Sequence, residues 1–208
     1  MNPTNPNRRT TRSSTDMTGA LVLAAGFSNR FGSVKLCAEL PDGDTVFQRT
    51  LRQLCAAIPE VIVVTRPDLQ PLLPATAAEV ICFDDAEQGM GASLAFGIAH
   101  VIGQRDWQGC LVCLADMPYI RPDTYQALAR RLTSHTIVVP RFRERLGNPA
   151  GFGRDYFGEL AALSGDQGGR QVLRTHRAAV IEMEVDDAAV LYDIDTPEDL
   201  ALAASQSG

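Results

Sequence analysis

The sequence predicts a three-layer α/β fold built on a doubly wound, mostly parallel, Rossmann-like sheet. Short apolar runs alternate along the chain with longer amphipathic segments, which is the order of strand and helix in such folds. The runs are apolar at successive positions, as expected for strands that are covered on both faces. The strands are predicted at residues 21–25, 60–65, 79–83, 109–115 and 136–140.

Helices are predicted between these strands. Thr45 can cap a helix that extends to about Ala57, and the apolar residues of this segment fall on one face. Pro122 suits the first turn of another helix, which should extend to about Leu132. Further helical segments are expected at residues 67–73 and 88–102.

The regular alternation breaks after Pro140. Residues 141–147 are charged, and the segment 148–153 is rich in turn-forming residues. Short helices are expected at residues 154–163 and 169–176, and a strand at 179–185. A short strand that leads into a capped helix should close the chain, at residues 191–200.

Charge and composition limit the classes of partner. The chain carries 19 Lys and Arg against 25 Asp and Glu, which gives a net charge of −6 and a pI of about 5.0. This acidic balance argues against broad binding to nucleic acid or to a membrane surface. No segment reaches the ~18 apolar residues of a membrane helix, and no secretory apolar region is present. We expect residues 1–17 to be a disordered tail.

The cysteines show no disulfide framework. They lie in apolar or amphipathic runs, which favours free thiols and a reducing, cytoplasmic location. Cys110 and Cys113 have the spacing of a redox motif, but residues three apart on a strand face opposite sides. We therefore expect these two thiols to pack in the core. The five cysteines are Cys37, Cys55, Cys82, Cys110 and Cys113.

The stretch from Ala20 to Lys35 joins the first strand to a loop of small, polar and cationic residues, among them Ser28. Gly26 lets the backbone approach a ligand closely, and Arg30 and Lys35 can neutralise an oligophosphate. The spacing of the glycines and of Lys35 does not fit a Walker A loop. A dinucleotide fingerprint opens directly into a helix, and no helix is predicted to start at this loop. A phosphate-binding loop and an ordinary surface loop both remain open on these residues alone.

Other ligand-type residues are predicted at the same edge of the sheet. Ligands of open parallel sheets bind outside the carboxyl ends of the strands, where Gly26, Gly89–Gly91 and Asp116 should all lie. The carboxylate of Asp116 is a hard oxygen ligand suited to Mg²⁺, which bridges nucleotide phosphates. The alternative is a turn or capping role. The Gly89–Gly91 segment could support a base or ribose, with Ser93 as a donor, or serve only as a turn into a helix.

The segment from Asp193 to Asp199 has a structural interpretation as a helix start. Asp195 or Thr196 can cap the helix, and Glu198 and Asp199 then meet its dipole. Asp193 is left without a role. Asp193 and Asp195 share a face at a strand end, so either could complete a metal site. We choose Asp193 as the second metal ligand beside Asp116, because capping already explains Asp195.

A second anion site is possible at residues 165–170. Arg170 could order an anion there, with Asp166 as the cap of the following helix. The three arginines between Pro140 and Gly147 are more typical of a solvated face. None of the histidines is paired as a catalytic triad would need, so the sequence gives no sign of a protein nucleophile.

Taken together, these residues resemble the molybdenum-cofactor cytidylyltransferases, within the larger nucleotidyltransferase superfamily. The first motif alone marks the superfamily, whereas the whole set, which spans about residues 20 to 200, is much more specific. The motifs are Leu23-Ala-Ala-Gly-Phe-Ser-Asn-Arg-Phe-Gly-Ser-Val-Lys35, Gly89-Met-Gly-Ala-Ser-Leu94, Leu114-Ala-Asp-Met-Pro118, Gly147-Asn-Pro149, Gly165-Asp-Gln-Gly-Gly-Arg170 and Asp193-Ile-Asp-Thr-Pro-Glu-Asp-Leu200.

The resemblance implies a Mg²⁺-dependent enzyme that transfers CMP from CTP to molybdopterin and releases pyrophosphate. Arg30 and Lys35 would hold the triphosphate, and Asp116 the Mg²⁺. It also implies a single nucleotidyltransferase domain at residues 18–208, with a nucleotide-binding half at about 18–118 and an acceptor-binding half at about 119–208. The nucleotide would contact Leu23, Ala24, Ala25, Gly26, Ser28, Arg30, Lys35, Gly89, Gly91 and Ser93, and the acceptor Asn148, Pro149, Asp166 and Arg170.

The resemblance leaves alternative substrates open. Ala24-Ala25 resembles the cytidylyl branch, whereas the guanylyl branch tends to have Ala-Gly before the same glycine. Asn148 stands where the cytidylyltransferases usually have His. The rival hypotheses are a sister enzyme that uses another NTP, such as GTP, or another phosphorylated acceptor, and a non-catalytic chaperone that hands the cofactor to a client molybdoenzyme.

Overall fold

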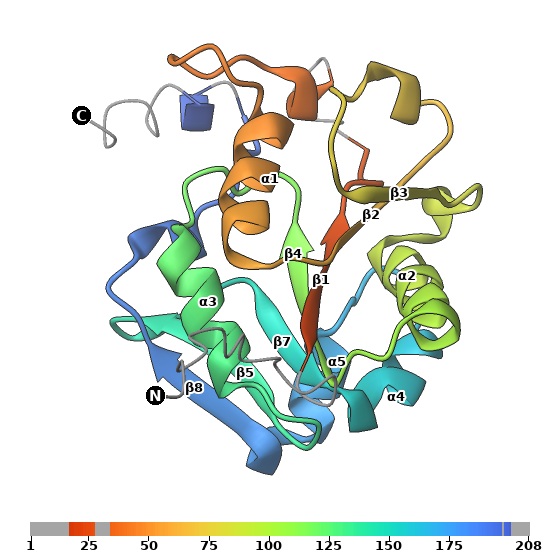
Figure 1. Ribbon diagram of the computed structural model, residues 1–208, viewed down its shortest axis with the longest axis vertical. Coiled ribbons are helices and arrows are strands. Elements are labelled where there is room, and N and C mark those ends of the chain that lie inside the picture. Colours follow the sequence, from red (N-terminus) through yellow and green to blue (C-terminus); the bar gives the residue numbers. More distant parts are fainter. Residues whose placement is uncertain (1–16, 28–33, 197, 201–208) are drawn as a thin grey trace, which may run out of the picture.

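A computed structural model describes residues 17–27, 34–196 and 198–200. In this part of the chain a central eight-stranded sheet lies between two layers of helices (Figure 1). The strands are β1 Thr18–Leu23, β2 Val61–Thr65, β3 Glu79–Cys82, β4 Gly109–Leu114, β5 Ile137–Phe142, β6 Arg145–Leu146, β7 Ala150–Gly153 and β8 Val180–Glu184. The α-helices are α1 Val46–Ala57, α2 Met90–Gln104, α3 Pro122–Arg131, α4 Phe157–Ala161 and α5 Arg170–Thr175. The predicted α/β class is confirmed.

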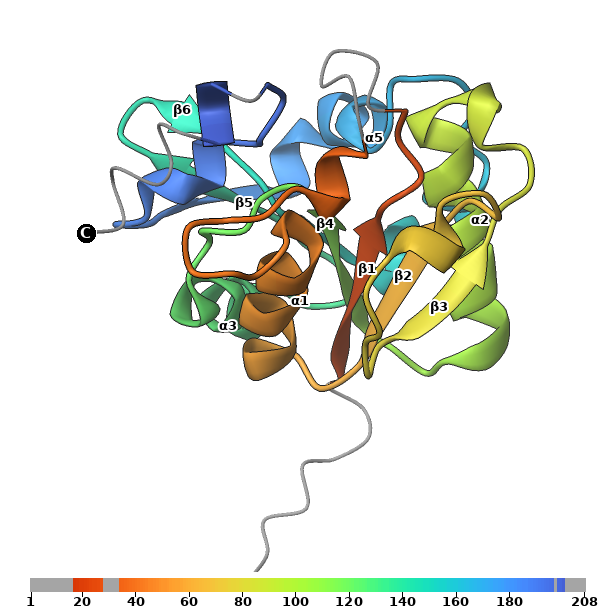
Figure 2. The same cartoon turned by 90° about the horizontal axis from the view of Figure 1, so that it is seen from above.

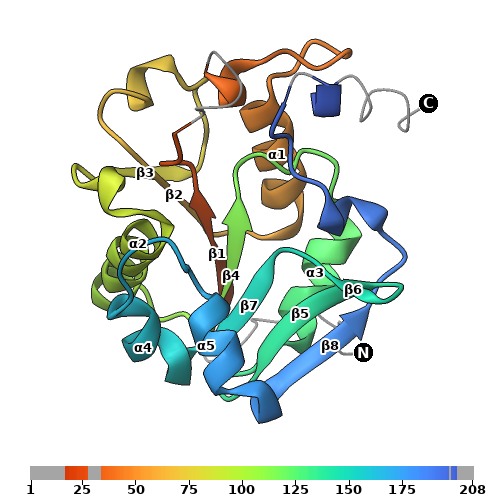
Figure 3. The same cartoon turned by 180° about the vertical axis from the view of Figure 1, so that it is seen from behind.

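The sheet has the order β3-β2-β1-β4-β7-β5-β6, with β8 paired to β5. The pairs β1–β2, β1–β4, β2–β3 and β5–β8 are parallel. Strand β7 is antiparallel to both β4 and β5, so it joins the two parallel sets into one sheet. Figure 3 shows β7 beside β4 on one side and β5 on the other. The predicted sheet is thus mostly parallel, with an antiparallel strand near its centre.

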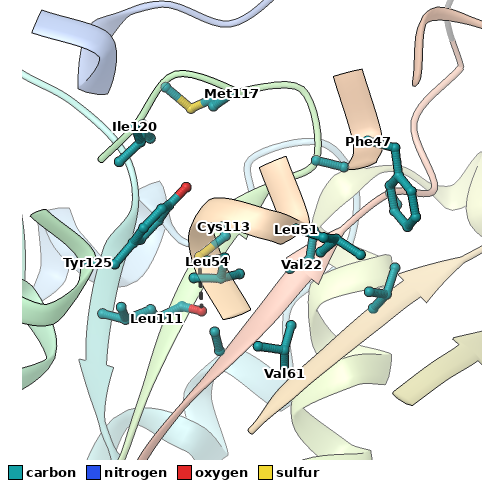
Figure 4. Packing of buried hydrophobic residues seen from close by; sticks show 14 of the residues in the cluster. Val22, Phe47, Leu51, Leu54, Val61, Leu111, Cys113, Met117, Ile120 and Tyr125 are labelled. Atoms are coloured by element: carbon teal, nitrogen blue, oxygen red, sulfur yellow. Dashed lines mark hydrogen bonds between the residues drawn. The ribbon is translucent and has the colours of Figure 1, made fainter. Parts of the chain in front are cut away.

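The helices cover the two faces of the sheet, and each face has its own core. On one face, α1 and α3 pack Phe47, Leu54 and Tyr125 against alternate strand residues such as Val22 (Figure 4). On the other face, α2, α4 and α5 pack against Leu21 and its neighbours. Figure 2 shows the sheet between α1 and α2. Successive residues of a strand alternate between the two cores, which is why the central strands β1, β2 and β4 are largely apolar on both faces.

Local sequence accounts for how several helices begin. Thr45 is the N-cap of α1, as predicted: its hydroxyl accepts a hydrogen bond from the N–H of Gln48, whose side chain accepts one from the N–H of Thr45. Pro122 occupies the first position of α3. A short 3₁₀ turn, Lys35–Cys37, begins at the end of the glycine loop, where the sequence predicted no helix.

Two predictions for the second half were wrong. The segment 150–153, expected to form a turn, is strand β7, because pairing with β4 and β5 outweighs the weak strand propensity of its glycines. The strand expected from residue 191 is replaced by a 3₁₀ turn, Ala188–Leu191, and an irregular segment to residue 195. None of the described helices is long and apolar enough to cross a membrane.

Candidate functional site

The candidate site lies where β1 and β4 end. The chain passes from β1 through α1 to β2 on one side, and from β3 through α2 to β4 on the other, so the connections diverge between β1 and β4. Such a switch point leaves a crevice at the carboxyl ends of the strands. Leu23, Ala24, Ala25 and Gly26 lie at the end of β1, and Asp116 lies two residues after the end of β4, at the predicted edge of the sheet. The N–H of Ala115 donates to the carbonyl of Leu23 (3.2 Å), which joins the two strand ends.

Lys35 connects two acidic segments at this point. Its Nζ donates to Oδ2 of Asp116 at 2.7 Å and to Oδ1 of Asp195 at 3.0 Å. The side chains of Lys35 and Asp116 are only 13% and 17% exposed. Lys35 starts the 3₁₀ turn whose next residue, Leu36, is buried in the core formed with α1 and α3, so packing sets the direction of the lysine.

Burial and charge oppose each other in this cluster. Desolvation lowers the pKa of Lys35, but the carboxylates of Asp116 and Asp195 outweigh it, so the pKa of this lysine is raised above its ordinary value. Desolvation raises the pKa of Asp116 above its ordinary range, although Lys35 acts in the opposite direction; the charge of Asp193 raises it further. Asp116 is therefore a carboxylate whose charge the surrounding protein only partly compensates.

Three carboxylates converge beside Lys35. Asp116, Asp193 and Asp195 each offer an oxygen within 4.8 Å of the others. The N–H of Ile194 donates to the carbonyl of Asp116 (3.0 Å), and the Ile194 side chain is buried. Asp193 and Asp195 are the chain neighbours of this anchored residue, and their carboxylates come together with that of Asp116.

The donor set fits a divalent cation. Oδ1 of Asp116 is buried and has no hydrogen-bond partner among the described residues, although a buried polar atom normally has one. Carboxylate oxygens are the ligands that Mg²⁺ prefers. Asp116 and Asp193, the predicted metal ligands, are therefore brought together by the fold, with Asp195 beside them.

The prediction that capping explains Asp195 was wrong. Thr196 and Asp199 make the reciprocal capping contacts: the hydroxyl of Thr196 accepts from the N–H of Asp199, and Asp199 accepts from the N–H groups of Asp195 and Thr196. The carboxylate of Asp195 instead accepts a hydrogen bond from Lys35. Asp195 thus belongs to the acidic cluster as fully as Asp193 does.

The glycine motif at the start of α2 meets the second glycine motif of the chain. The N–H of Gly91 donates to the carbonyl of Gly165 at 2.6 Å. A Cβ at Gly89 would come within 2.2 Å of Oδ1 of Asp166, so that side chain lies directly over Gly89. Ser93, expected to offer its hydroxyl to a ribose, is buried and donates to the carbonyl of Gly89 (3.3 Å) within its own helix.

The remaining predicted acceptor residues are placed as follows. Asp166 was expected to cap α5, which was wrong: Gly169 precedes the helix and no side chain caps it. Arg170 begins α5 and is exposed. Pro149 is buried, and the N–H of Asn148 donates to the carbonyl of Val190 (2.8 Å), so this segment packs against the turn that leads to Asp193. Ser28 and Arg30 lie outside the described residues.

Sequence reasoning missed Arg66 at this edge of the sheet. Arg66 directly follows β2, and its Nη1 donates to the carbonyls of Ala25 (3.3 Å) and Gly26 (2.7 Å). A cation at the carboxyl end of a strand next to β1 was the available signal, because the same rule had selected Asp116 after β4.

Comparison with known proteins identifies the family to which this chain belongs. Residues 20–180 match the model of the MobA-like NTP transferase domain. The chain is 31% identical to the purine catabolism protein PucB of Bacillus subtilis over 194 residues, which cover 86% of this chain and 92% of that protein. It is 29% identical to a probable molybdenum cofactor guanylyltransferase of Methanosarcina mazei over 137 residues, 62% of this chain and 60% of that protein.

Solved structures show the same architecture over nearly the whole chain. The crystal structure of Rv0371c from Mycobacterium tuberculosis H37Rv aligns with a TM-score of 0.80 and 30% identity, over 93% of this chain and 100% of that chain. A structure of Rv0371c in complex with manganese aligns with a TM-score of 0.76 at 27% identity, over the same shares of the two chains. The chain therefore belongs to the MobA-like NTP transferase domain family and is a nucleotidyltransferase.

Proposed function

We propose that this nucleotidyltransferase transfers CMP from CTP to the phosphate of the molybdopterin form of the molybdenum cofactor and releases pyrophosphate. The observation that carries the proposal is the convergence of Lys35 with Asp116, Asp193 and Asp195 at the switch point. A cation beside a cluster of carboxylates suits a triphosphate bound together with a divalent metal ion. The resemblance in the motifs selects the acceptor class.

The reaction needs no protein nucleophile. An oxygen of the acceptor phosphate attacks the α-phosphorus of the NTP, the bond to the β-phosphate oxygen breaks, and pyrophosphate leaves with that electron pair. The protein contributes position and charge compensation. Lys35 supplies a fixed ammonium group, and Asp116 and Asp193 supply the oxygens that would hold Mg²⁺. When bound there, Mg²⁺ would supply positive charge that stabilises the charge developing on the phosphates.

Two observations support a divalent metal ion. The buried Oδ1 of Asp116 has no hydrogen-bond partner among the described residues, as expected of an oxygen that a metal ion would satisfy. The structure of the relative Rv0371c in complex with manganese shows that a protein of this fold and 27% identity is found with a divalent cation. We propose Mg²⁺ as the physiological ion.

The choice of CTP rests on Ala24-Ala25. Both side chains are buried at the end of β1, and the carbonyl of Ala25 is held by Arg66. This pair of alanines resembles the cytidylyl branch, whereas the guanylyl branch tends to have Ala-Gly at these positions, which favours CTP over GTP. GTP is the second candidate, because relatives from Methanosarcina mazei and Geobacillus carry the name molybdenum cofactor guanylyltransferase.

The proposed acceptor contacts lie on two segments. Asn148 and Pro149 pack against the turn that precedes Asp193, and Asp166 lies over Gly89. The exposed guanidinium of Arg170 could bind the acceptor phosphate. A client molybdoenzyme would receive the product. A chaperone without catalysis would retain the binding contacts and lack only the transfer step.

Side-by-side measurements with CTP, GTP, ATP and UTP test the proposal. We expect Mg²⁺ with CTP to raise the melting temperature most, because a ligand stabilises the state that binds it. Pyrophosphate release should require CTP and the molybdopterin acceptor together. Release with GTP and not with CTP would refute the cytidylyl assignment. CTP binding without release, for any phosphorylated pterin acceptor, would favour the chaperone.

A further inference from the structure

Arg66 is held rigidly at the edge of the candidate site. Its carbonyl accepts hydrogen bonds from the N–H groups of Leu69 (3.1 Å) and Gln70 (3.0 Å), which fix the turn after β2. Its Nε donates to both carboxylate oxygens of Asp68, at 2.8 and 3.0 Å. The side chain is 14% exposed, so the guanidinium has little freedom to move.

Two side chains at the end of β2 donate hydrogen bonds to three successive carbonyls of the segment that follows β1. The hydroxyl of Thr65 donates to the carbonyl of Ala24 at 3.3 Å. Nη1 of Arg66 then donates to the carbonyls of Ala25 and Gly26, at 3.3 and 2.7 Å. The guanidinium also lies 4.2 Å from the ring centroid of Phe27, within the range of a cation–π contact. One side chain thus contacts each residue from 25 to 27.

These contacts set the direction of two backbone donors. A trans peptide is planar, and its N–H points opposite to its C=O. Because both carbonyls converge on one nitrogen of Arg66, the N–H groups of Gly26 and Phe27 point away from that nitrogen. Neither N–H finds an acceptor among the described residues. Adjacent backbone N–H groups that point outward form an anion-binding concavity.

We infer that Arg66 is a positioning residue for nucleotide binding, which presents the N–H groups of Gly26 and Phe27 to acceptor oxygens of the NTP. This inference rests on the proposed function, since the ligand is the NTP of that reaction. The guanidinium acts through the backbone and need not touch the nucleotide. The acceptor oxygens belong either to the triphosphate or to the base.

The variants Arg66→Ala, Arg66→Lys and Asp68→Asn test the inference. Alanine removes both carbonyl contacts, lysine keeps the charge but loses the planar fork, and Asp68→Asn weakens the support of the fork. Arg52→Ala is the matched control, because Arg52 is an exposed arginine whose ion pair is with Asp44 and not with the segment at residues 24–27. If Arg66→Ala does not fold, the other two variants carry the test.

We expect the KM for the NTP to rise about tenfold in Arg66→Ala, as for the loss of one or two hydrogen bonds, and by less in the other two variants. The KM for the acceptor should stay near that of the wild type, as should every value for Arg52→Ala. A purely structural role would instead affect the KM for both substrates alike, which would overturn the inference.

Measuring the binding of inorganic triphosphate distinguishes whether the N–H groups bind oxygens of the triphosphate or oxygens of the base. If the N–H groups bind phosphate, Arg66→Ala weakens the binding of CTP and of triphosphate; if they bind the base, it weakens that of CTP alone. Either result supports the inference, and equal affinities in wild type and Arg66→Ala for both ligands would overturn it. Wild-type protein that binds no NTP would refute the proposed function itself, so the two failures are distinguishable.

Discussion

At the scale of single residues, the site is defined by charges held close together. Among the described residues, Asp116, Asp193 and Asp195 bring three carboxylates together beside the ammonium of Lys35, in a partly buried cluster. Like charges this close destabilise one another unless cations compensate them. This repulsion is the physical reason why we propose a divalent metal ion at the cluster.

The first prediction concerns Asp116. Replacing it with Asn keeps its shape but removes the carboxylate that we propose as a metal ligand and that pairs with Lys35. We expect Asp116→Asn to lower the rate of pyrophosphate release at least ~100-fold, the usual loss when charge stabilisation is removed from such a site. The melting temperature should change by only a few degrees, because Lys35 keeps Asp195 as a partner.

The matched control is Asp106→Asn, which removes an exposed carboxylate whose ion pair with Arg154 lies at the surface. Activity and melting temperature should both be unchanged in this variant. Near-normal Mg²⁺-dependent turnover by a folded Asp116→Asn variant would show that Asp116 is not a metal ligand.

The second prediction separates Asp193 from Asp195. If Asp193 is the second metal ligand, Asp193→Asn should raise the Mg²⁺ concentration needed for half-maximal activity at least ~tenfold. Asp195→Asn should have a smaller effect on this concentration, because its carboxylate also engages Lys35. A titration of Mg²⁺ against pyrophosphate release measures both. The reverse order of effects would assign the ligand role to Asp195.

At the scale of secondary-structure elements, the start of α2 packs closely against the loop at residues 164–166. Gly91 permits the N–H contact to Gly165, since a Cβ there would lie 2.6 Å from the Gly165 carbonyl oxygen. The positive φ of Gly89, 102°, lets the chain enter α2 at the same point. The two glycines therefore allow close contact between the backbones of α2 and this loop. The local sequence suggested support for a base or ribose, or a turn into a helix, but not this contact.

The third prediction compares two glycines of α2. Gly91→Ala should lower the free energy of unfolding by about 1–3 kcal/mol, because the new methyl group would overlap with the carbonyls of Ser164 and Gly165. Gly103→Ala, in the same helix, meets nothing within 4 Å and should raise the stability by roughly 0.5–1 kcal/mol. Urea unfolding measures both. Equal effects of the two substitutions would contradict the close contact at Gly91.

Strand β4 illustrates what the sequence could predict at this scale. Cys113 lies in the core on the side of α1 and α3, and Cys110 in the core on the side of α2, which confirms that the two thiols face opposite sides. Strand periodicity was sufficient for that prediction. The capping role assigned to Asp195 failed, since its partner Lys35 is 160 positions away in the sequence and no local pattern reports such a contact.

The fourth prediction concerns the reactivity of these thiols. Burial raises the pKa of Cys110 to about 12 and that of Cys113 well above its ordinary value, so both remain protonated thiols at pH 8. Iodoacetamide should therefore modify exposed Cys55 first and leave Cys110 and Cys113 unmodified until the protein unfolds. Mass spectrometry of the labelled peptides identifies the sites. Labelling of Cys110 at the rate of Cys55 in folded protein would contradict this burial.

At the scale of the whole molecule, one sheet carries both halves of the predicted domain. The alternation of strands and helices predicted the parallel part at residues 18–114, and with it the switch point and Asp116. It could not predict β7, because Ala150–Gly153 has two glycines in four residues and forms a strand only through its partners. Yet β7 joins β4 to β5, and so connects the half that we expect to bind the nucleotide to the half that we expect to bind the acceptor.

The fifth prediction follows from this connection. Gly109–Val112 of β4 pairs with β7, and Phe152 of β7 is buried in the core shared with α2 and α4. Neither half can separate without breaking this pairing and exposing that core, so we expect one cooperative unfolding transition. In scanning calorimetry the calorimetric and van't Hoff enthalpies should agree, and saturating Mg²⁺ with CTP should shift the single transition upward as a whole. Two resolved transitions, with only the lower or the upper one shifted by nucleotide, would show that the halves are separate folding units.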